Sequence, residues 1–197
     1  IRNIIAAIVF ARSQGIPFGT IKKAFAAFQG VAGRMEKIEL PRGHLERKTQ
    51  NVSVYVDYAH TPDALQNVYS VFPKSRKICV LGNTGGGRDS WKRPEMAKVA
   101  EKYCDEIILT NEDPYDEDPE KIIQEMAVGC TRKEPLLILD RRSAIREALR
   151  RGSKGDVILI TGKGTDPYIM GPNGKKELWD DATVAREELK KVLGSRF

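Results

Sequence analysis

Apolar residues recur at helical spacing in the first thirty positions of the chain. One helical face runs over residues 4–11 and ends near Gly15, and a second covers residues 21–28 with Thr20 as its expected N-cap. Two short helices with apolar faces cannot enclose a core of their own. We therefore expect residues 1–30 to be the end of a preceding domain whose main body lies outside this sequence.

Beyond residue 34, short β-rich runs alternate with amphipathic helical segments. The predicted strands cover residues 52–56, 77–81, 106–110, 136–139 and 156–161. The predicted helices cover residues 62–71, 94–103, 119–130, 143–150 and 182–193. Strands that alternate with helices are typical of parallel sheets. The pattern predicts an α/β fold, a Rossmann-like doubly wound, mostly parallel sheet with helices on both faces.

Composition narrows the class of protein. The 197 residues suffice for one domain and a fragment of another, and 41% hydrophobic with 30% charged residues is typical of a soluble globular chain. The formal charge of +6 is a weak hint of anionic ligands. The sequence has no dense basic tail and no apolar run near the ~20 residues that span a bilayer. We expect a cytoplasmic protein with no nucleic-acid and no membrane partner.

Three cysteines, Cys79, Cys104 and Cys130, lie far apart and form no CxxC pair. With only His44 and His60 beside them, they give no zinc pattern. We expect reduced thiols and no metal site in this chain.

Polar or glycine-rich loops follow four of the predicted strands. They are residues 57–63, 82–89, 111–115 and 162–166. In a doubly wound sheet ligands bind beyond the carboxyl ends of the strands. The four loops therefore predict a ligand site along one edge of the sheet.

The loop at 82–89 fits neither common phosphate-binding motif. Thr84 breaks GxGxxG, and Arg88 stands where a Walker A loop needs Lys. Its backbone amides can hold an anion, a function that Arg88, Lys92 and Arg93 would favour, or the loop is a tight turn and nothing more.

Single residues in the other loops also leave alternatives open. Asp57 can accept a ribose hydroxyl, face a metal or cap the next helix. His60 has no Ser or Cys nucleophile beside it, so we assign no catalytic residue. Lys163 either reaches an anion or is an ordinary exposed lysine, and Tyr58, Trp91 and Trp179 could as well be packing residues.

Taken together, several motifs make the sequence resemble the Mur ligase family, above all its UDP-N-acetylmuramoyl-tripeptide synthetase branch. The most specific is DYAHTPDAL, which starts at Asp57. The motifs are, in chain order, Asn3–Ala7, Gly33–Glu36, Val56–Leu65, Gly82–Met96, Gly162–Gly164 and Asp181–Arg186. The resemblance implies that residues 1–33 are the last helices of the central ATP-binding domain and that residues 34–197 are the C-terminal domain.

The resemblance also implies a reaction. Members of the family are ATP-dependent ligases that build the peptidoglycan precursor, and so serve cell-wall biogenesis, cell shape and division. ATP converts a carboxylate to an acyl phosphate, which an amine then attacks. The implied substrates are UDP-N-acetylmuramoyl-L-alanyl-D-glutamate and a diamino acid, L-lysine or meso-diaminopimelate. ATP and Mg²⁺ would be bound mainly by the central domain. We therefore expect this chain alone to be inactive.

On the nucleotide side, the resemblance implies roles for four residues. Asn3 would face the adenine, Arg34 would contact the phosphates and Asp57 the ribose, with His60 nearby.

On the amino-acid side, the resemblance implies that Arg88 helps hold the incoming amino acid. The segment Glu112-Asp113-Pro114-Tyr115 falls where diaminopimelate-adding members carry Asp-Asn-Pro-Arg. Glu112, Asp113 and Tyr115 are therefore expected to contact the amino acid. Gly162 and Lys163 belong to the matching Gly-Lys-Gly motif, and Asp166 falls where those members carry Glu after it. Tyr115 cannot fork onto a distal carboxylate as arginine does, and Asp166 is one methylene short, so lysine fits at least as well. The acidic run 112–118 suits a cationic side chain, or is a solvated helix entry.

Other functions compete with this one. The chain could be a stand-alone nucleotide- or amino-acid-binding Rossmann-like module. Folylpolyglutamate and cyanophycin synthetases have related C-terminal domains, but their equivalent of the Asp57 loop reads nearer to Asp-x-Ala-His-Asn-Pro. A dinucleotide oxidoreductase is disfavoured by Thr84 and by the lack of an acidic residue after Thr110.

Overall fold

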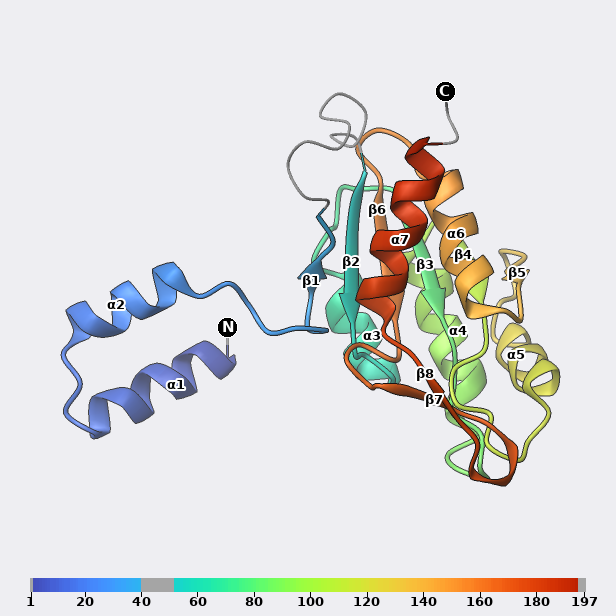
Figure 1. The fold of residues 1–197 in the computed structure, drawn as a ribbon, viewed down its shortest axis with the longest axis horizontal. Helices are drawn as coiled ribbons and strands as arrows, with labels where there is room; N and C mark the ends of the chain where they lie inside the picture. Colours follow the sequence, from blue (N-terminus) through green and yellow to red (C-terminus); the bar gives the residue numbers. More distant parts are fainter. Residues whose placement is uncertain (1, 40–51, 195–197) are drawn as a thin grey trace. The chain divides into compact units, whose positions relative to one another are not determined.

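The computed structural model describes residues 2–39 and 52–194 (Figure 1). Its contacts divide the chain into two units, Ile1–Gly30 and Val31–Phe197. This division falls three residues before the domain boundary expected between residues 33 and 34, which stays a prediction. His44 lies outside the described residues.

The first unit consists of two helices, α1 (Arg2–Ser13) and α2 (Phe18–Ala27). The prediction that Thr20 caps the second helix is wrong: α2 begins two residues earlier, with Pro17 at the N-cap position and no side-chain cap. Ile21 is buried, whereas Val9 and Phe10 are 62% and 68% exposed. The pair presents the apolar surface expected of helices without a core of their own.

The second unit is built on a six-stranded sheet in the order β1-β2-β6-β3-β4-β5. Its strands are β1 (Glu36–Lys37), β2 (Ser53–Asp57), β3 (Lys77–Leu81), β4 (Glu106–Leu109), β5 (Leu136–Leu137) and β6 (Val157–Thr161). Neighbouring strands are parallel from β2 to β5, and the two-residue β1 pairs antiparallel with β2. The predicted fold class is confirmed. Strand β1 was not predicted, because two residues are too few to show a strand pattern.

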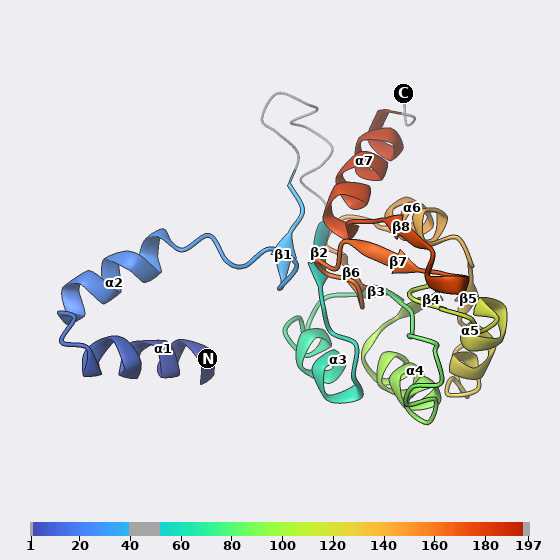
Figure 2. The same ribbon diagram turned by 60° about the horizontal axis from the view of Figure 1, so that its bottom comes forward.

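Helices cover both faces of this sheet (Figure 2). They are α3 (Pro62–Tyr69), α4 (Lys92–Tyr103), α5 (Pro119–Ala127), α6 (Arg141–Arg151) and α7 (Asp181–Gly194). Two ended earlier than expected: α3 stops before Val71, which is 54% exposed, and α5 stops before Cys130. In the described part of the chain, no helix is long and apolar enough to cross a bilayer.

The alternation of side chains along each strand produces the two cores. On β3, Ile78 and Val80 pack with α6 and α7, whereas Cys79 and Leu81 pack with α3, α4 and α5. Because both faces are covered, β3 is buried at every position. This is why the strand reads as an uninterrupted apolar run in the sequence.

A small hairpin that the sequence did not indicate precedes α7. It consists of β7 (Tyr168–Met170) and β8 (Lys176–Leu178), joined by the short 3₁₀ segment Pro172–Gly174. Every residue of β8 is exposed, and Leu178 is 79% exposed. A strand with no buried face leaves no alternating pattern to detect.

The cysteines correct another expectation. Cys79 and Cys104 form a disulfide, and Cys130 is the free thiol. The sequence separation of 25 concealed this pairing. Since α4 runs back along the sheet face after β3, its C-cap residue Cys104 comes to lie beside Cys79.

Candidate functional site

The carboxyl ends of the central parallel strands lie side by side in register. Asp57 at the end of β2 pairs with Thr161 at the end of β6, and Leu81 of β3 pairs with Leu109 of β4. The four loops expected to line one edge therefore do meet there. Asn3 is exposed on α1 in the other unit, and its role stays a prediction.

Asp57 is held by backbone amides and does not cap a helix. Its Oδ1 accepts from the Ala59 N–H and its Oδ2 from the Met35 N–H, each at 2.8 Å. The cap of α3 is Thr61, whose Oγ1 accepts from the Ala64 N–H at 3.3 Å. The helix-cap alternative for Asp57 is therefore wrong. Each of its oxygens retains a lone pair for a further donor such as a hydroxyl.

Arg34 and His60 both contact the ring of Tyr58, the residue that follows this carboxylate in the chain. The Arg34 guanidinium carbon lies 4.5 Å from the Tyr58 ring centroid, and the His60 ring meets Tyr58 edge-on at 4.8 Å. His60 Nδ1 is 2.8 Å from the Tyr58 carbonyl oxygen, so Nδ1 carries the proton and donates it. Arg34 is exposed and pairs with no carboxylate in the part of the chain that the structure describes.

Lys163 is neither exposed nor available as a bare positive charge. Its side chain is 1% exposed, and its ammonium donates to both carboxylate oxygens of Asp113 at 2.8 and 2.9 Å and to Asp166 Oδ2 at 2.8 Å. Both alternatives from the sequence need correction: the lysine is buried, and its charge is neutralised by carboxylates of this chain. Two carboxylates around one ammonium leave a local excess of negative charge.

Glu112 adds a third carboxyl group to this cluster. It is buried, its Oε1 accepts from the Thr84 hydroxyl at 3.2 Å, and its Oε2 has no hydrogen-bond partner among the residues that the structure describes. Burial raises the pKa of Glu112 above its ordinary value. Gly162, at φ +114°, lies so close that an added Cβ would be 2.3 Å from that free oxygen. Glycine is thus required where this loop passes Glu112.

Arg88 and Tyr115 come together at the mouth of the glycine-rich loop. The Arg88 guanidinium carbon is 5.9 Å from the Tyr115 ring centroid, near the limit for a cation–π contact. Tyr115 adopts a left-handed backbone conformation, φ +52°, and its N–H donates to the Met170 carbonyl at 3.0 Å. The β7–β8 hairpin therefore helps to fix Tyr115. Arg88 is exposed and has no carboxylate partner among the described residues.

Some backbone N–H groups of the glycine-rich loop already donate hydrogen bonds within the protein. The Gly85 N–H donates to the Asp113 carbonyl at 2.7 Å, and the Gly87 N–H donates to Glu117 Oε1 at 2.6 Å. Arg93, expected to attract an anion, is 2% exposed and pairs with Glu117 and Glu125. Lys92 is buried and lies 3.7 Å from Asp89. These contacts favour a tight turn for this part of the loop, and of its three expected cations only Arg88 has no carboxylate partner among the described residues.

Most of the acidic run has a structural task. Asp116 accepts from the Asn173 N–H at 2.7 Å, Glu117 binds Arg93, and Asp118 caps α5 through the Glu120 N–H. Of the first two members, Asp113 binds Lys163, and Glu112 accepts from the Thr84 hydroxyl. The run is thus in part a helix entry, whereas a role for its first residues toward a cationic ligand stays a prediction.

A buried ion pair that the sequence did not indicate connects the strand ends at this edge of the sheet to α7. Arg141 binds Asp181 side-on, and it also donates to the Thr161 carbonyl at 2.9 Å and the Asn111 carbonyl at 3.3 Å. The Trp179 indole donates to the same aspartate at 2.8 Å. One guanidinium thus ties the ends of β6 and β4 to α7. The 40 residues between the partners left no local signal.

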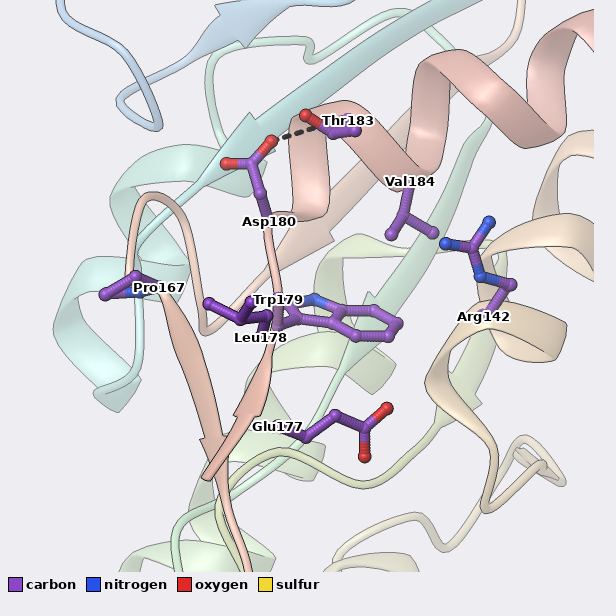
Figure 3. Close-up of a pocket in the computed structure, with 8 residues that line it drawn as sticks. All are labelled: Arg142, Pro167, Glu177, Leu178, Trp179, Asp180, Thr183 and Val184. Carbon is purple, nitrogen blue, oxygen red and sulfur yellow. Dashed lines mark hydrogen bonds between the residues drawn. The ribbon is translucent and has the colours of Figure 1, made fainter. Parts of the chain in front are cut away.

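A separate surface groove lies between the β7–β8 hairpin and the first turn of α7 (Figure 3). It is open, has a volume of about 400 Å³ and is lined by Arg142, Pro167, Glu177, Leu178, Trp179, Asp180, Thr183 and Val184. Two of its charged side chains already have partners: Arg142 binds Glu187, and Asp180 accepts from the Thr183 N–H. The groove includes Trp179, which the sequence left open as a packing residue, but none of the residues predicted to bind nucleotide or amino acid.

Comparison with known proteins decides the family. The sequence model described as "Mur ligase, glutamate ligase domain" matches residues 33–164, about two thirds of the chain. The chain belongs to the Mur ligase family. Its matched span includes the Asp57 loop, the glycine-rich loop and the Gly162–Gly164 turn, which are the segments that meet at the edge of the sheet.

This Mur ligase domain has relatives along nearly its whole length. It is 41% identical over 196 residues to the UDP-N-acetylmuramoyl-L-alanyl-D-glutamate–2,6-diaminopimelate ligase of Syntrophomonas wolfei and 40% identical over 192 residues to that of Synechocystis. The alignments cover 96% and 95% of this chain but only 38% and 36% of the relatives. The chain therefore spans little more than a third of their length.

Solved structures agree with this Mur ligase fold. A UDP-N-acetylmuramoyl-L-alanyl-D-glutamate–2,6-diaminopimelate ligase matches with a TM-score of 0.71 and 31% identity over 96% of this chain and 38% of that one. The folylpolyglutamate synthase of Thermotoga maritima matches with a TM-score of 0.57 and 16% identity over 82% and 35%. The second likeness shows the fold alone.

The residues at the edge fit a nucleotide better than a resident metal. An exposed Arg34, without a carboxylate partner in the described ranges, and a buried Asp57 suit a phosphate and a ribose hydroxyl. In contrast, the described residues contain no group of three or more His, Cys, Asp or Glu side chains placed to hold a metal ion.

Proposed function

We propose that this chain is the C-terminal part of an ATP-dependent ligase that joins a diamino acid to UDP-N-acetylmuramoyl-L-alanyl-D-glutamate. Its task is to bind the incoming amino acid and to close over ATP. The observation that carries the proposal is that Asp113 and Asp166 share one lysine, Lys163, while a third carboxyl group, Glu112, is buried against the neighbouring Gly162, within a chain that belongs to the Mur ligase family.

The charge balance of that cluster supports a cationic ligand. Lys163 offsets one of the charges on Asp113 and Asp166, and the free oxygen of Glu112 lacks a donor. An ammonium group supplies both a positive charge and N–H donors. Arg88, exposed and without a carboxylate partner among the described residues, would hold the carboxylate of the same amino acid.

Two amino acids fit this scheme. The relatives' names favour 2,6-diaminopimelate. Tyr115, which offers no charge for a second carboxylate, favours L-lysine. The family's reaction makes an amide by way of an acyl phosphate, so this chain's contribution is to place the attacking amine and to neutralise charge. Asn3, Arg34, Asp57 and His60 would contact the nucleotide, and the chain alone would not catalyse ligation.

Calorimetric titration of the chain with L-lysine and with meso-diaminopimelate, each with and without Mg–ADP, tests the proposal. We expect binding of one diamino acid that is lost in Asp166→Ala and retained in Lys98→Ala, a surface control. Preference for lysine would make Tyr115 a specificity residue, and preference for diaminopimelate would refute that role. Binding of an amino acid with a neutral side chain as tightly as lysine would overturn the cationic site, and ligation by the isolated chain would overturn its expected inactivity.

A further inference from the structure

The Tyr58 ring contacts a residue of its own loop and one from a separate segment of the chain. The Arg34 guanidinium lies over one side of its ring at 4.5 Å, and the His60 ring contacts it at 4.8 Å with an interplanar angle of 75°. The His60 hydrogen bond to the Tyr58 carbonyl fixes the orientation of the imidazole. The Tyr58 ring therefore makes a cation–π contact with Arg34 and an edge-on contact with the His60 ring.

Close backbone packing fixes the position of Tyr58. A Cβ added to Gly164 would lie 2.8 Å from the Tyr58 Cβ and 2.9 Å from the Gly33 carbonyl oxygen. A Cβ on Gly33 would lie 2.6 Å from the Thr165 nitrogen. Both glycines have positive φ, +51° and +63°. The loop that carries Lys163 is thus packed directly against the segment that carries Arg34.

We propose that Tyr58 is a positioning residue whose ring holds the Arg34 guanidinium, which pairs with no carboxylate among the described residues, ready for an anionic ligand, and that contact with Gly164 sets the place of the ring. An exposed arginine otherwise samples many rotamers, and ordering it on binding costs affinity. Stacking on a seated ring removes part of that cost beforehand. That the anion is a nucleotide phosphate rests on the proposed function; the stacking does not.

The stacking itself is tested by NMR on the ligand-free chain. The side-chain signals of Arg34, assigned with Arg34→Lys, should show an aromatic ring-current shift that persists in Tyr58→Phe and disappears in Tyr58→Leu. Gly164→Ala should move the same signals, because its methyl group displaces Tyr58. Tyr103→Leu, which removes a cation–π contact with Lys102 at 5.0 Å on another part of the fold, is the matched control and should leave them unchanged. Arg34 signals without a ring-current shift would overturn the proposal.

Titration with Mg–ADP tests whether Tyr58 acts through Arg34. We expect Tyr58→Leu to weaken binding roughly two- to fivefold, as the loss of an exposed cation–π contact would, and Tyr58→Phe to restore it. In an Arg34→Ala background, Tyr58→Leu should have no further effect. An equal loss in both backgrounds would overturn the positioning role. If the wild-type chain does not bind Mg–ADP, the nucleotide part of the proposed function fails, and the NMR experiment still decides the positioning.

Discussion

Arg141 and Asp181 form a side-on ion pair, with hydrogen bonds of 2.8 and 2.7 Å, at a point where their side chains are only 1% and 0% exposed. The pair joins α6 to the start of α7 directly beneath the edge that carries the candidate site. The remaining Arg141 donors reach the Thr161 and Asn111 carbonyls, so the guanidinium is well satisfied. Such a pair stabilises little relative to apolar side chains, but it is costly to break.

We predict that Asp181→Asn destabilises the chain by about 3–5 kcal/mol, since it leaves the Arg141 charge buried without a counterion. The double variant Arg141→Met with Asp181→Leu should recover most of that loss because no charge stays buried. Urea unfolding followed by circular dichroism measures both. A single variant as stable as the wild type would contradict the buried position of the pair.

Gly162 is predicted to be irreplaceable for a steric reason. Gly162→Ala places a methyl group against the buried Glu112 carboxyl at a φ of +114°, and should cost about 2–4 kcal/mol. Gly87→Ala is the matched control: its φ is also positive, +72°, but nothing lies within 4 Å of the added carbon. It should cost only about 1 kcal/mol. Equal losses in the two variants would refute the close approach to Glu112.

Glu188 is predicted to make the stability depend on acid pH. Its carboxylate accepts hydrogen bonds from Arg146, Arg142 and Lys191, and the first of these contributes most to lowering its pKa from 4.5 to about 2. A lowered native pKa contributes stability that is present above pH 4.5 and is lost as the pH falls toward 2.

The matched variants for this prediction are Glu188→Gln and Glu95→Gln. The first should lower the free energy of unfolding by about 1–3 kcal/mol at neutral pH and flatten its decline between pH 4.5 and 2. The second removes an exposed pair with Lys98 and should change it by less than about 1 kcal/mol. An unchanged acid limb in Glu188→Gln would rule out this carboxylate as its source.

The disulfide between Cys79 and Cys104 predicts a thiol count of one. Thiol titration in denaturant without reductant should detect Cys130 alone, and three thiols would contradict the pairing. In the native chain Cys130 should react slowly, because burial raises its pKa to about 11 and little thiolate forms. Reduction should cost about 3 kcal/mol of stability, from the chain entropy of the loop of 25 residues that the bond closes.

The order of elements could be predicted from the sequence because it depends on local patterns. The strand at 77–81 matches its predicted bounds, since a strand buried on both faces is a continuous apolar run. The polar loops after the strands could be assigned to one edge because parallel strands end together. The hairpin at Tyr168–Leu178 escaped prediction because its exposed outer strand has no hydrophobic period.

The sequence by itself determined the α/β class, the family and the segments that form the candidate site, because hydrophobic period and short motifs are properties of neighbouring residues. Only the tertiary structure decided which charges meet. Lys163 and Asp113 are 50 residues apart, and Arg141 and Asp181 are 40 apart. Coulombic and hydrogen-bonding partners are chosen by distance in space, and that distance is set by the register of the sheet and the packing of its helices. The composition of a loop therefore indicated that a site is charged, whereas folding decided which charge remains available to a ligand.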